Sequence, residues 1–215
     1  MSEINRQFLL AARPSGMVKT SDFEYRESPV PEIEDGEVLI RTSHISLDPS
    51  MRGQMENRAD YVAPLEIGDV MRAGCIGHIV ASRNPAYPEG AQVGGSFGMQ
   101  DYCVSDGRNP PFRVFDDQIE PTVALGVLGG TGMTAYFGLL EIGEPKAGDT
   151  IVISGAAGAT GSVAGQIAKI QGCTVIGMAG SDEKCAWLTD ELGFDAAINY
   201  KTQDVGAELD RLCPN

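Results

Sequence analysis

The sequence lacks any apolar run close to the roughly 20 residues that a membrane-spanning helix needs. Residues 1–16 hold only a five-residue apolar run, which is too short for the core of a signal peptide. The five cysteines are scattered without a C-x-x-C pair, which argues against a disulfide framework or a structural zinc site. We therefore expect a cytoplasmic protein that has no membrane partner.

Positive charge is also scarce. The chain has 16 Lys and Arg against 30 Asp and Glu, which gives a formal net charge of −14. A field of this sign repels nucleic acid and anionic lipid, so we expect no nucleic-acid partner. A ligand that carries phosphate would need a local group of donors to overcome the overall charge.

Short β-type runs fill the first part of the chain. Residues 8–14 and 23–27 predict a strand pair, and residues 37–47 predict a strand after the Asp35-Gly36 turn. Residues 73–82 and 101–105 predict further strands, separated by turn-rich segments such as "RNPAYPEGAQVGG". These runs indicate a small barrel-like or sandwich domain over residues 1–121.

The periodicity changes near residue 122. Apolar residues at helical spacing follow, interrupted by "GGTG" at residues 129–132. Beyond residue 148 strands and helices alternate, with strands predicted at 150–154, 173–178 and 195–199, and helices at 159–171, 182–192 and 203–212. This order predicts βαβ units with a parallel, right-handed sheet, and hence an α/β domain over residues 122–215.

That α/β domain is only half of a doubly wound fold, which comprises two βαβαβ halves. Without a fourth strand, residues 150–154 would form an exposed apolar edge. We therefore expect the 215 residues to be the front part of a longer protein, missing roughly 90 residues at ~30 per βα unit.

Three glycines stand at three-residue spacing in "TIVISGAAGATGSVAGQ". Gly155, Gly158 and Gly161 follow an apolar strand and open an apolar-periodic helix, which is the context of a dinucleotide-binding turn. Gly158 would let the backbone approach a pyrophosphate, and the free N–H groups of the helix would face that anion. The alternative is a tight strand-to-helix turn that binds no ligand.

The end of the next strand indicates which dinucleotide is bound. NAD sites usually place an acidic residue there, whereas this chain has Gly180 and Ser181, followed by Lys184. A small residue, a hydroxyl and a cation suit a 2′-phosphate, which favours NADP(H). The alternative is ordinary helix capping, with Ser181 as N-cap, and Asp182 and Glu183 would repel a phosphate unless they point away.

Long stretches resemble the zinc-independent medium-chain reductases of the prostaglandin reductase and alkenal double-bond reductase type, especially the curcumin reductase branch. The matching stretches are "ISLDPSMRGQM" (45–55), "GDVMRAGCIGHIVAS" (68–82), 125–173 and "GSDEKCAWLTDELGFDAAINYKT" (180–202). The resemblance implies a chaperonin-10-like catalytic barrel followed by a Rossmann domain, whose sheets pair into homodimers. It implies that the turn from Gly158 through Ala159 and Thr160 to Gly161 contacts the pyrophosphate.

The resemblance also assigns the remaining cofactor contacts and a substrate pocket. Lys184 and Tyr200 would bind the 2′-phosphate, and Thr134 would lie near the nicotinamide. Ser50, in "DPSMR", stands where the family has a pocket tyrosine, and Met51 and Tyr61 are further pocket candidates. These differences, together with "GGTG" where the family has "GMPG", leave the size and orientation of the substrate open.

The proton donor is not identified by these motifs. Tyr61 and Tyr136 are candidates only by location, each with packing as the alternative, and the tyrosine that the family favours lies beyond Asn215. Ser46 stands in the region of the zinc-dependent relatives' cysteine, and His78 lacks a following acid. We expect His78 to be a satisfied core residue and His44 to be structural.

The leading prediction is a zinc-independent enzyme that uses NADPH to reduce the C=C bond of an α,β-unsaturated ketone or aldehyde. Hydride would pass to the β-carbon, and hydroxyl hydrogen bonds would stabilise the enolate before protonation. One alternative is a quinone reductase on the same scaffold. Another is a catalytically silent protein that binds the nucleotide.

Overall fold

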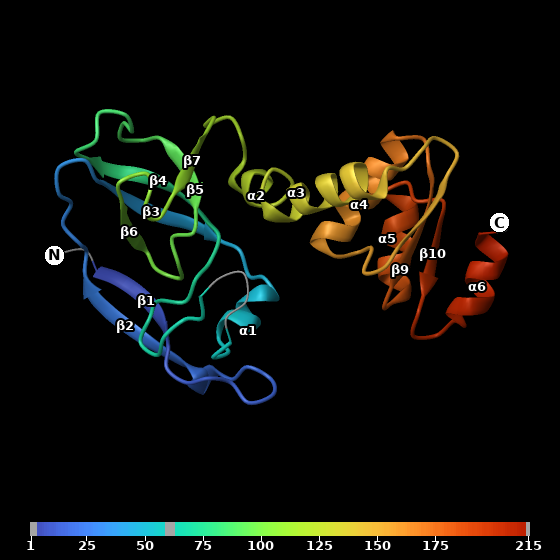
Figure 1. Ribbon diagram of the computed structural model, residues 1–215, viewed down its shortest axis with the longest axis horizontal. Coiled ribbons are helices and arrows are strands. Elements are labelled where there is room, and N and C mark those ends of the chain that lie inside the picture. Colours follow the sequence, from blue (N-terminus) through green and yellow to red (C-terminus); the bar gives the residue numbers. More distant parts are fainter. Residues whose placement is uncertain (1–3, 59–62, 214–215) are drawn as a thin grey trace. The chain divides into compact units, whose positions relative to one another are not determined.

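The computed structural model describes residues 4–58 and 63–213. The chain divides into two compact units, Met1–Leu125 and Gly126–Asn215. Figure 1 shows that the first unit is built mainly of strands, whereas helices flank a sheet in the second. Among the described residues, no helix has the length and apolar character required to cross a bilayer.

The first unit begins with an antiparallel strand pair, β1 (Ile4–Leu10) and β2 (Phe23–Pro29), which confirms the predicted pairing. Arg6 on β1 reaches the segment before β6 and forms an ion pair with Asp101, with Nε 2.6 Å from Oδ2. This pair anchors the β1–β2 sheet to the rest of the unit.

A five-stranded antiparallel sheet forms the body of the first unit, in the order β6-β3-β4-β5-β7. Its strands are β3 (Val38–Ile45), β4 (Cys75–Ser82), β5 (Gln92–Gly95), β6 (Tyr102–Ser105) and β7 (Phe112–Phe115). The strands predicted at 37–47, 73–82 and 101–105 correspond to β3, β4 and β6. Two short helical segments accompany the sheet, α1 (Ser50–Gln54) and α2 (Pro121–Leu125).

β5 corrects the prediction, because it lies inside a segment that was interpreted as a turn-rich separator. The two glycines of β5 make its sequence resemble that of a turn. A Cβ on Gly94 would lie 2.7 Å from Ile76 Cδ1 and from Phe115, so the strand needs glycine there to pack closely. Composition alone therefore misrepresents this segment.

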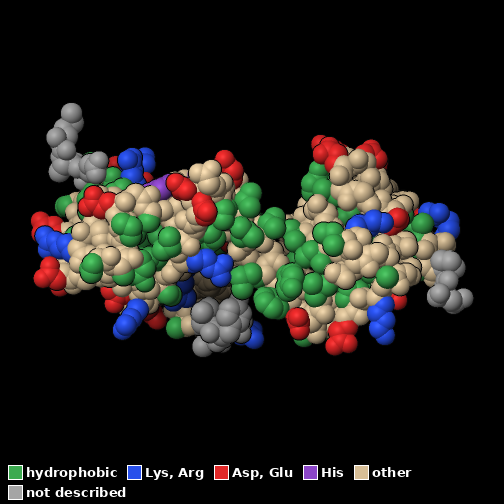
Figure 2. Space-filling view, turned by 90° about the horizontal axis from the view of Figure 1, so that it is seen from above, with side chains coloured by type: hydrophobic (Ala, Val, Ile, Leu, Met, Phe, Trp, Pro, Cys, Tyr) green, Lys and Arg blue, Asp and Glu red, His purple; other side chains and the backbone are tan. Residues whose placement is uncertain are grey.

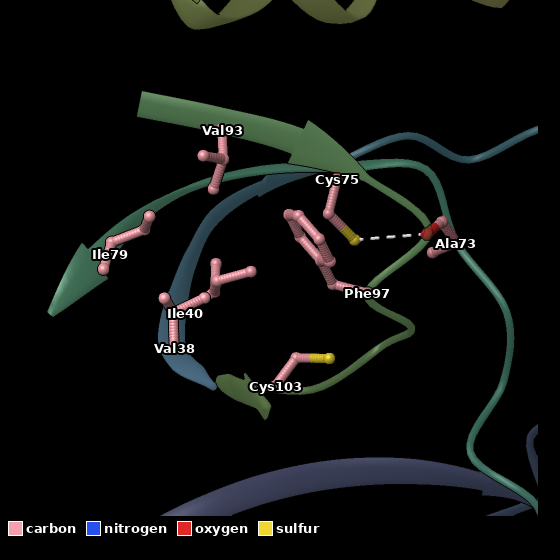
Figure 3. Close-up of a cluster of buried hydrophobic side chains, with 8 residues drawn as sticks. All are labelled: Val38, Ile40, Ala73, Cys75, Ile79, Val93, Phe97 and Cys103. Carbon is pink, nitrogen blue, oxygen red and sulfur yellow. Dashed lines mark hydrogen bonds between the residues drawn. The ribbon is translucent and has the colours of Figure 1, made fainter. Parts of the chain in front are cut away.

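The core of the first unit lies against the five-stranded sheet. Figure 3 shows its side chains gathered inside the curve of β3 and β4: Val38, Ile40, Ala73, Cys75, Ile79, Val93, Phe97 and Cys103. The Cys75 thiol donates to the carbonyl oxygen of Ala73 at 3.3 Å. Burial raises the pKa of Cys75 to about 12 and that of Cys103 to about 11.

His78 is not a core residue, contrary to the sequence-based expectation. It lies on β4 between the buried residues Gly77 and Ile79, and it is exposed. Alternate residues of a strand point to opposite faces, so His78 projects away from the core that Ile79 enters. Cys75 and Ile79 lie on the core face of β4, whereas Val80, two residues after His78 and on the same face, is also exposed.

The second unit contains a three-stranded parallel sheet in the order β10-β9-β8, with β8 at one edge. The elements that follow residue 126 are α3 (Gly130–Phe137), the π-helical segment η2 (Gly138–Gly143), β8 (Thr150–Ile153), α4 (Ala159–Ile170), β9 (Thr174–Ala179), α5 (Asp182–Asp190), β10 (Ala196–Asn199) and α6 (Val205–Leu212). The predicted alternation of strands and helices is confirmed, with end shifts of one or two residues.

Close packing of helix on sheet holds the second unit together. The buried cluster comprises Ala156, Ala168, Cys173, Val175, Ala179, Leu188 and Phe194. Gly165 on α4 leaves room for the Phe194 ring, which a Cβ at that position would overlap. A Cβ on Gly177 of β9 would likewise lie 2.7 Å from Leu188 and 2.9 Å from Phe194. Glycine at these positions sets the separation between helix and sheet.

On the face that Figure 2 shows, acidic side chains occur on both units. Basic side chains are fewer, in line with the formal charge of −14. A local excess of cations would therefore distinguish an anion-binding position from the rest of the surface.

Candidate dinucleotide-binding site

The glycine turn links the end of β8 to the start of α4. Gly155 adopts φ +57°, a left-handed conformation that favours glycine. Gly158 is the N-cap of α4 in an extended conformation, and its N–H donates to the carbonyl oxygen of Gly155 at 2.9 Å. Ala156 is fully buried, and its N–H donates to the carbonyl oxygen of Met178 on β9. The turn is therefore anchored to the sheet.

Gly161 brings the first turn of α4 against this loop. A Cβ at Gly161 would lie 2.5 Å from the carbonyl oxygen of Gly155 and 2.9 Å from Cα of Ala156. Only glycine permits the helix to approach the loop so closely. The glycines of this spacing are therefore needed for different steric reasons. Gly155 adopts a left-handed conformation, whereas Gly161 permits the helix to pack closely on the loop.

The turn remains open on its outer side. No atom lies within 4 Å of a Cβ placed on Gly155, and a Cβ on Gly158 would meet only the Gly155 carbonyl oxygen. Within residues 4–58 and 63–213, nothing accepts a hydrogen bond from the backbone N–H groups of Ala159, Thr160 and Gly161. These donors lie at the positive end of the α4 dipole, which is an arrangement that suits a phosphate.

A second cluster lies where β9 and β10 end. The Tyr200 hydroxyl would be 2.6 Å from a Cβ on Gly180, and Lys201 Cε would be 3.3 Å from the same point. Gly180 therefore lets the turn after β10 lie against the end of β9. Tyr200 is 50% exposed, so its ring stays accessible beside this glycine.

Ser181 acts as the N-cap of α5, with its hydroxyl accepting from the Lys184 backbone N–H at 3.3 Å. The capping alternative is thus observed, and it leaves the Lys184 ammonium free. Asp182, which follows, accepts a hydrogen bond from Asn199 Nδ2 at 2.6 Å. Its carboxylate is therefore tied to β10.

Lys184 borders a surface groove of about 520 Å³ beside the glycine turn. Ala157 and Trp187 line the groove together with the acidic residues Glu183, Asp190 and Glu191. In the part of the chain that the structure describes, no carboxylate lies within ion-pair distance of the Lys184 ammonium. The cation is available to a ligand.

Thr134 lies on α3, where its hydroxyl donates to the carbonyl oxygen of Gly130 at 2.7 Å. The side chain is exposed, and the hydroxyl oxygen can still accept a hydrogen bond. Tyr136, on the same helix, is 48% exposed.

The substrate candidates lie in the first unit. Ser50 is exposed at the start of α1, and Met51 packs against the buried cluster of the five-stranded sheet. Tyr61 lies outside the described residues. Arg52, which the sequence did not single out, donates to the carbonyl oxygens of Pro14 and Gly16 and fixes α1 against that loop.

Metal-binding side chains do not assemble in the described ranges, where no three His, Cys, Asp or Glu residues are grouped so that they could hold an ion. His44 is exposed and lies 3.0 Å from the Ser43 hydroxyl through Nδ1. Two residues that sequence reasoning missed, Asn199 and Lys201, join the cluster at the ends of β9 and β10. Their proximity depends on the pairing of the strands, which no local motif reports.

Two protein families match the chain. Residues 6–111 match the family described as the N-terminal domain of oxidoreductase, and residues 159–215 match the family described as zinc-binding dehydrogenase. The chain is 43% identical to CurA from Vibrio vulnificus, whose structure in complex with NADPH superposes with a TM-score of 0.91 over 98% of this chain and 62% of that one. The fold is therefore that of the medium-chain dehydrogenases/reductases.

Sequence relatives define the branch. The chain is 46% identical to YfmJ of Bacillus subtilis (strain 168), covering 100% of this chain and 63% of that protein. It is 42% identical to the NADPH-dependent curcumin reductase of Escherichia coli (strain K12), covering 98% of this chain and 61% of the reductase. It thus spans about three fifths of the length of these curated relatives. Over most of its length the chain is similar to the medium-chain reductases that include the curcumin reductases and prostaglandin reductase 1.

Proposed function

We propose that this protein is an NADPH-dependent reductase of the C=C bond of α,β-unsaturated ketones or aldehydes. The observation that carries the proposal is the open glycine turn, in which the N–H groups of Ala159, Thr160 and Gly161 have no acceptor among the described residues. Relatives named NADPH-dependent curcumin reductase and NADP(+)-dependent 2-alkenal reductase support this choice of cofactor and reaction.

The pyrophosphate would bind at that turn, from Gly155 through Gly158 to Gly161. These three donors and the helix dipole would offset its charge, which the protein's overall negative field opposes. In a turn without a ligand, water would satisfy these donors, because Gly158 and Ala159 are exposed.

The 2′-phosphate would lie beside the Gly180-Ser181 corner that follows β9. Lys184 would supply the charge, Tyr200 a hydroxyl donor, and Ser181 a small side chain that leaves room. Thr134 would accept a hydrogen bond beside the nicotinamide, because its hydroxyl already donates to Gly130. NADPH, when bound, would supply the hydride that goes to the β-carbon of the substrate.

The protein's own task is then to orient the enone and to stabilise the enolate oxygen with hydroxyl or N–H donors. We propose residues 1–121, which lie within the first unit, as the catalytic domain, with Ser50, Met51 and Tyr61 near the substrate. Residues 122–215 would form the dinucleotide-binding domain. We also propose a cytoplasmic location. We further propose that the protein is a homodimer, as its resemblance to the medium-chain reductases implies.

The test uses the full-length protein with NADPH and two classes of acceptor, an alkenal and a quinone. We expect quenching of protein fluorescence on NADPH addition, and NADPH oxidation with the alkenal faster than with the quinone. Turnover with the quinone alone would favour the quinone reductase. Nucleotide binding without any turnover would favour the catalytically silent protein that binds the nucleotide. Absence of nucleotide binding would refute the proposal.

A further inference from the structure

Asn199, the last residue of β10, is a buried polar residue that lies between the two halves of the proposed 2′-phosphate site. It is only 4% exposed. Its Nδ2 donates to Asp182 Oδ1 at 2.6 Å, and its Oδ1 accepts from the Lys201 backbone N–H at 3.1 Å. A backbone N–H can only donate, so the amide has one orientation, with Nδ2 directed at the carboxylate.

The Asp182 carboxylate is the acidic group nearest in sequence to the Gly180-Ser181 corner. Glycine and serine at that corner suit a phosphate, whereas a carboxylate directed toward it would repel one. The amide of Asn199 holds the carboxylate on the β10 side. A hydrogen bond to a charged acceptor of this length is strong enough to keep one rotamer populated.

The same amide also shapes the turn that follows β10. Through the Lys201 N–H it fixes the segment that carries the Tyr200 hydroxyl and Lys201 Cε against Gly180. Lys201 forms no ion pair in the described part of the chain, and its side chain lies against Gly180. One buried side chain thus contacts both the Asp182 carboxylate and the turn that carries Lys201.

We propose that Asn199 is a positioning residue that sets the preference for NADPH over NADH. It does so by holding the Asp182 carboxylate away from the 2′-phosphate. The proposal rests on the proposed function, because it presupposes that the nucleotide binds at the glycine turn.

A purely structural role is the competing explanation. The backbone N–H of Asn199 donates to Gln203 Oε1 at 2.7 Å, and its carbonyl oxygen accepts from Thr202 and Gln203. If Asn199 only stabilised this loop, its loss would weaken both nucleotides equally. The carboxylate mechanism differs, because it affects only the nucleotide with the extra phosphate and depends on the charge of Asp182.

The experiment compares Asn199→Ala, Asp182→Asn and the double variant in the full-length protein, with Kd values for NADPH and NADH measured by fluorescence titration. For Asn199→Ala we expect the Kd of NADPH to rise about fivefold, the effect of one unit charge near 4 Å in water. The Kd of NADH should change less than twofold. In the double variant, the Kd of NADPH should return to within about twofold of the native value.

Asp182→Asn alone gives an independent test that does not require Asn199→Ala to fold. Since the carboxylate is already held away, this variant should leave the Kd of NADPH within about twofold. Asn84→Ala is a matched control, because Asn84 donates its amide to the carbonyl oxygen of Gly36 in the first unit. It should leave the NADPH-to-NADH ratio unchanged.

Three results would overturn the inference: an equal loss of both nucleotides in Asn199→Ala, no recovery in the double variant, or a large gain in NADPH affinity for Asp182→Asn alone. Its failure is separable from that of the proposed function. A native protein that prefers NADPH while the variants respond equally would refute only the role of Asn199. A native protein that binds neither nucleotide would refute both.

Discussion

At the scale of single residues, sequence and tertiary structure contribute different parts of the candidate site. The spacing of Gly155, Gly158 and Gly161 could be interpreted locally, since a strand, a turn and a helix follow one another in the chain. Asn199 and Lys201 could not be found in this way. They reach Gly180 and Asp182 only because β10 pairs with β9 in parallel, which places both strand ends at one edge.

Lys184 provides the first test at this scale. Lys184→Ala should weaken NADPH about tenfold, because a hydrogen bond to a charged group contributes roughly 1.5–3 kcal/mol, and it should barely change NADH. Titration of both nucleotides measures this, with Lys146→Ala as a control, whose side chain forms no ion pair among the described residues. Equal losses for both nucleotides would argue against a phosphate role for Lys184.

The buried thiols of the first unit give a second test. Burial raises the pKa of Cys75 to about 12 and that of Cys103 to about 11, so the thiolate is scarce at pH 8. Iodoacetamide should therefore modify Cys185 and Cys213, which are half-buried, before these two. Peptide mass spectrometry after timed labelling checks the order. Early labelling of Cys75 in the native protein would contradict the burial described here.

At the scale of helices and strands, the second unit was predicted well, because its helices of 8 to 12 residues show their repeat and separate the short strands. The first unit was predicted less completely. β5 and β7 have four residues each, too few to show a clear alternation, and Gly94 and Gly95 make β5 resemble a turn. Only the packing of Ile76 and Phe115 against Gly94 explains why a strand carries glycine there.

Gly161 tests how closely α4 must approach the glycine turn. In Gly161→Ala the new Cβ would lie 2.5 Å from the Gly155 carbonyl oxygen, so the helix must shift. We expect a loss of about 1–3 kcal/mol in the free energy of unfolding, together with weaker NADPH binding.

Gly206→Ala on α6 is the matched control, because the nearest neighbour of its Cβ would be an Asp204 oxygen at 3.4 Å. It should be neutral or stabilising by up to about 1 kcal/mol. Thermal unfolding and NADPH titration of both variants provide the comparison. If Gly161→Ala behaved like this control, the close approach would not be required.

At the scale of the whole molecule, the change of periodicity near residue 122 predicts a domain boundary, and the chain divides into two compact units after Leu125. The excess of acidic residues was equally plain from composition, but which carboxylates stabilise the fold was not. Asp101 pairs with Arg6, 95 residues away in the chain, and Asp195 pairs with Lys169 at 2.7 Å. Such partners become known only when the tertiary structure brings them together.

These two carboxylates predict how stability depends on pH. The hydrogen bond from Arg6 is the main cause that lowers the pKa of Asp101. Burial opposes ionisation of Asp195, but hydrogen bonds from Lys169 and from the Val175 N–H outweigh it, so its pKa is also lowered. A lowered pKa means that the folded state binds the proton less readily than the unfolded state. The stabilisation is therefore present above the ordinary value near 3.9 and is lost as the pH falls through the folded pKa.

Each unit contains one of these two ion pairs, so acid should destabilise both units. Variants that remove one ion pair at a time separate the contribution of each pair to stability. Arg6→Gln and Lys169→Gln should each lower the thermal midpoint at pH 7, and the difference from the native protein should shrink as the pH falls below about 4. Added salt should also reduce the difference, because both pairs are partly exposed to solvent. Arg83→Gln serves as the control, since Arg83 has no ion-pair partner in the described ranges. A deficit in Arg6→Gln that stayed constant from pH 7 to pH 3 would mean that its cause is lost packing and not the ionised carboxylate.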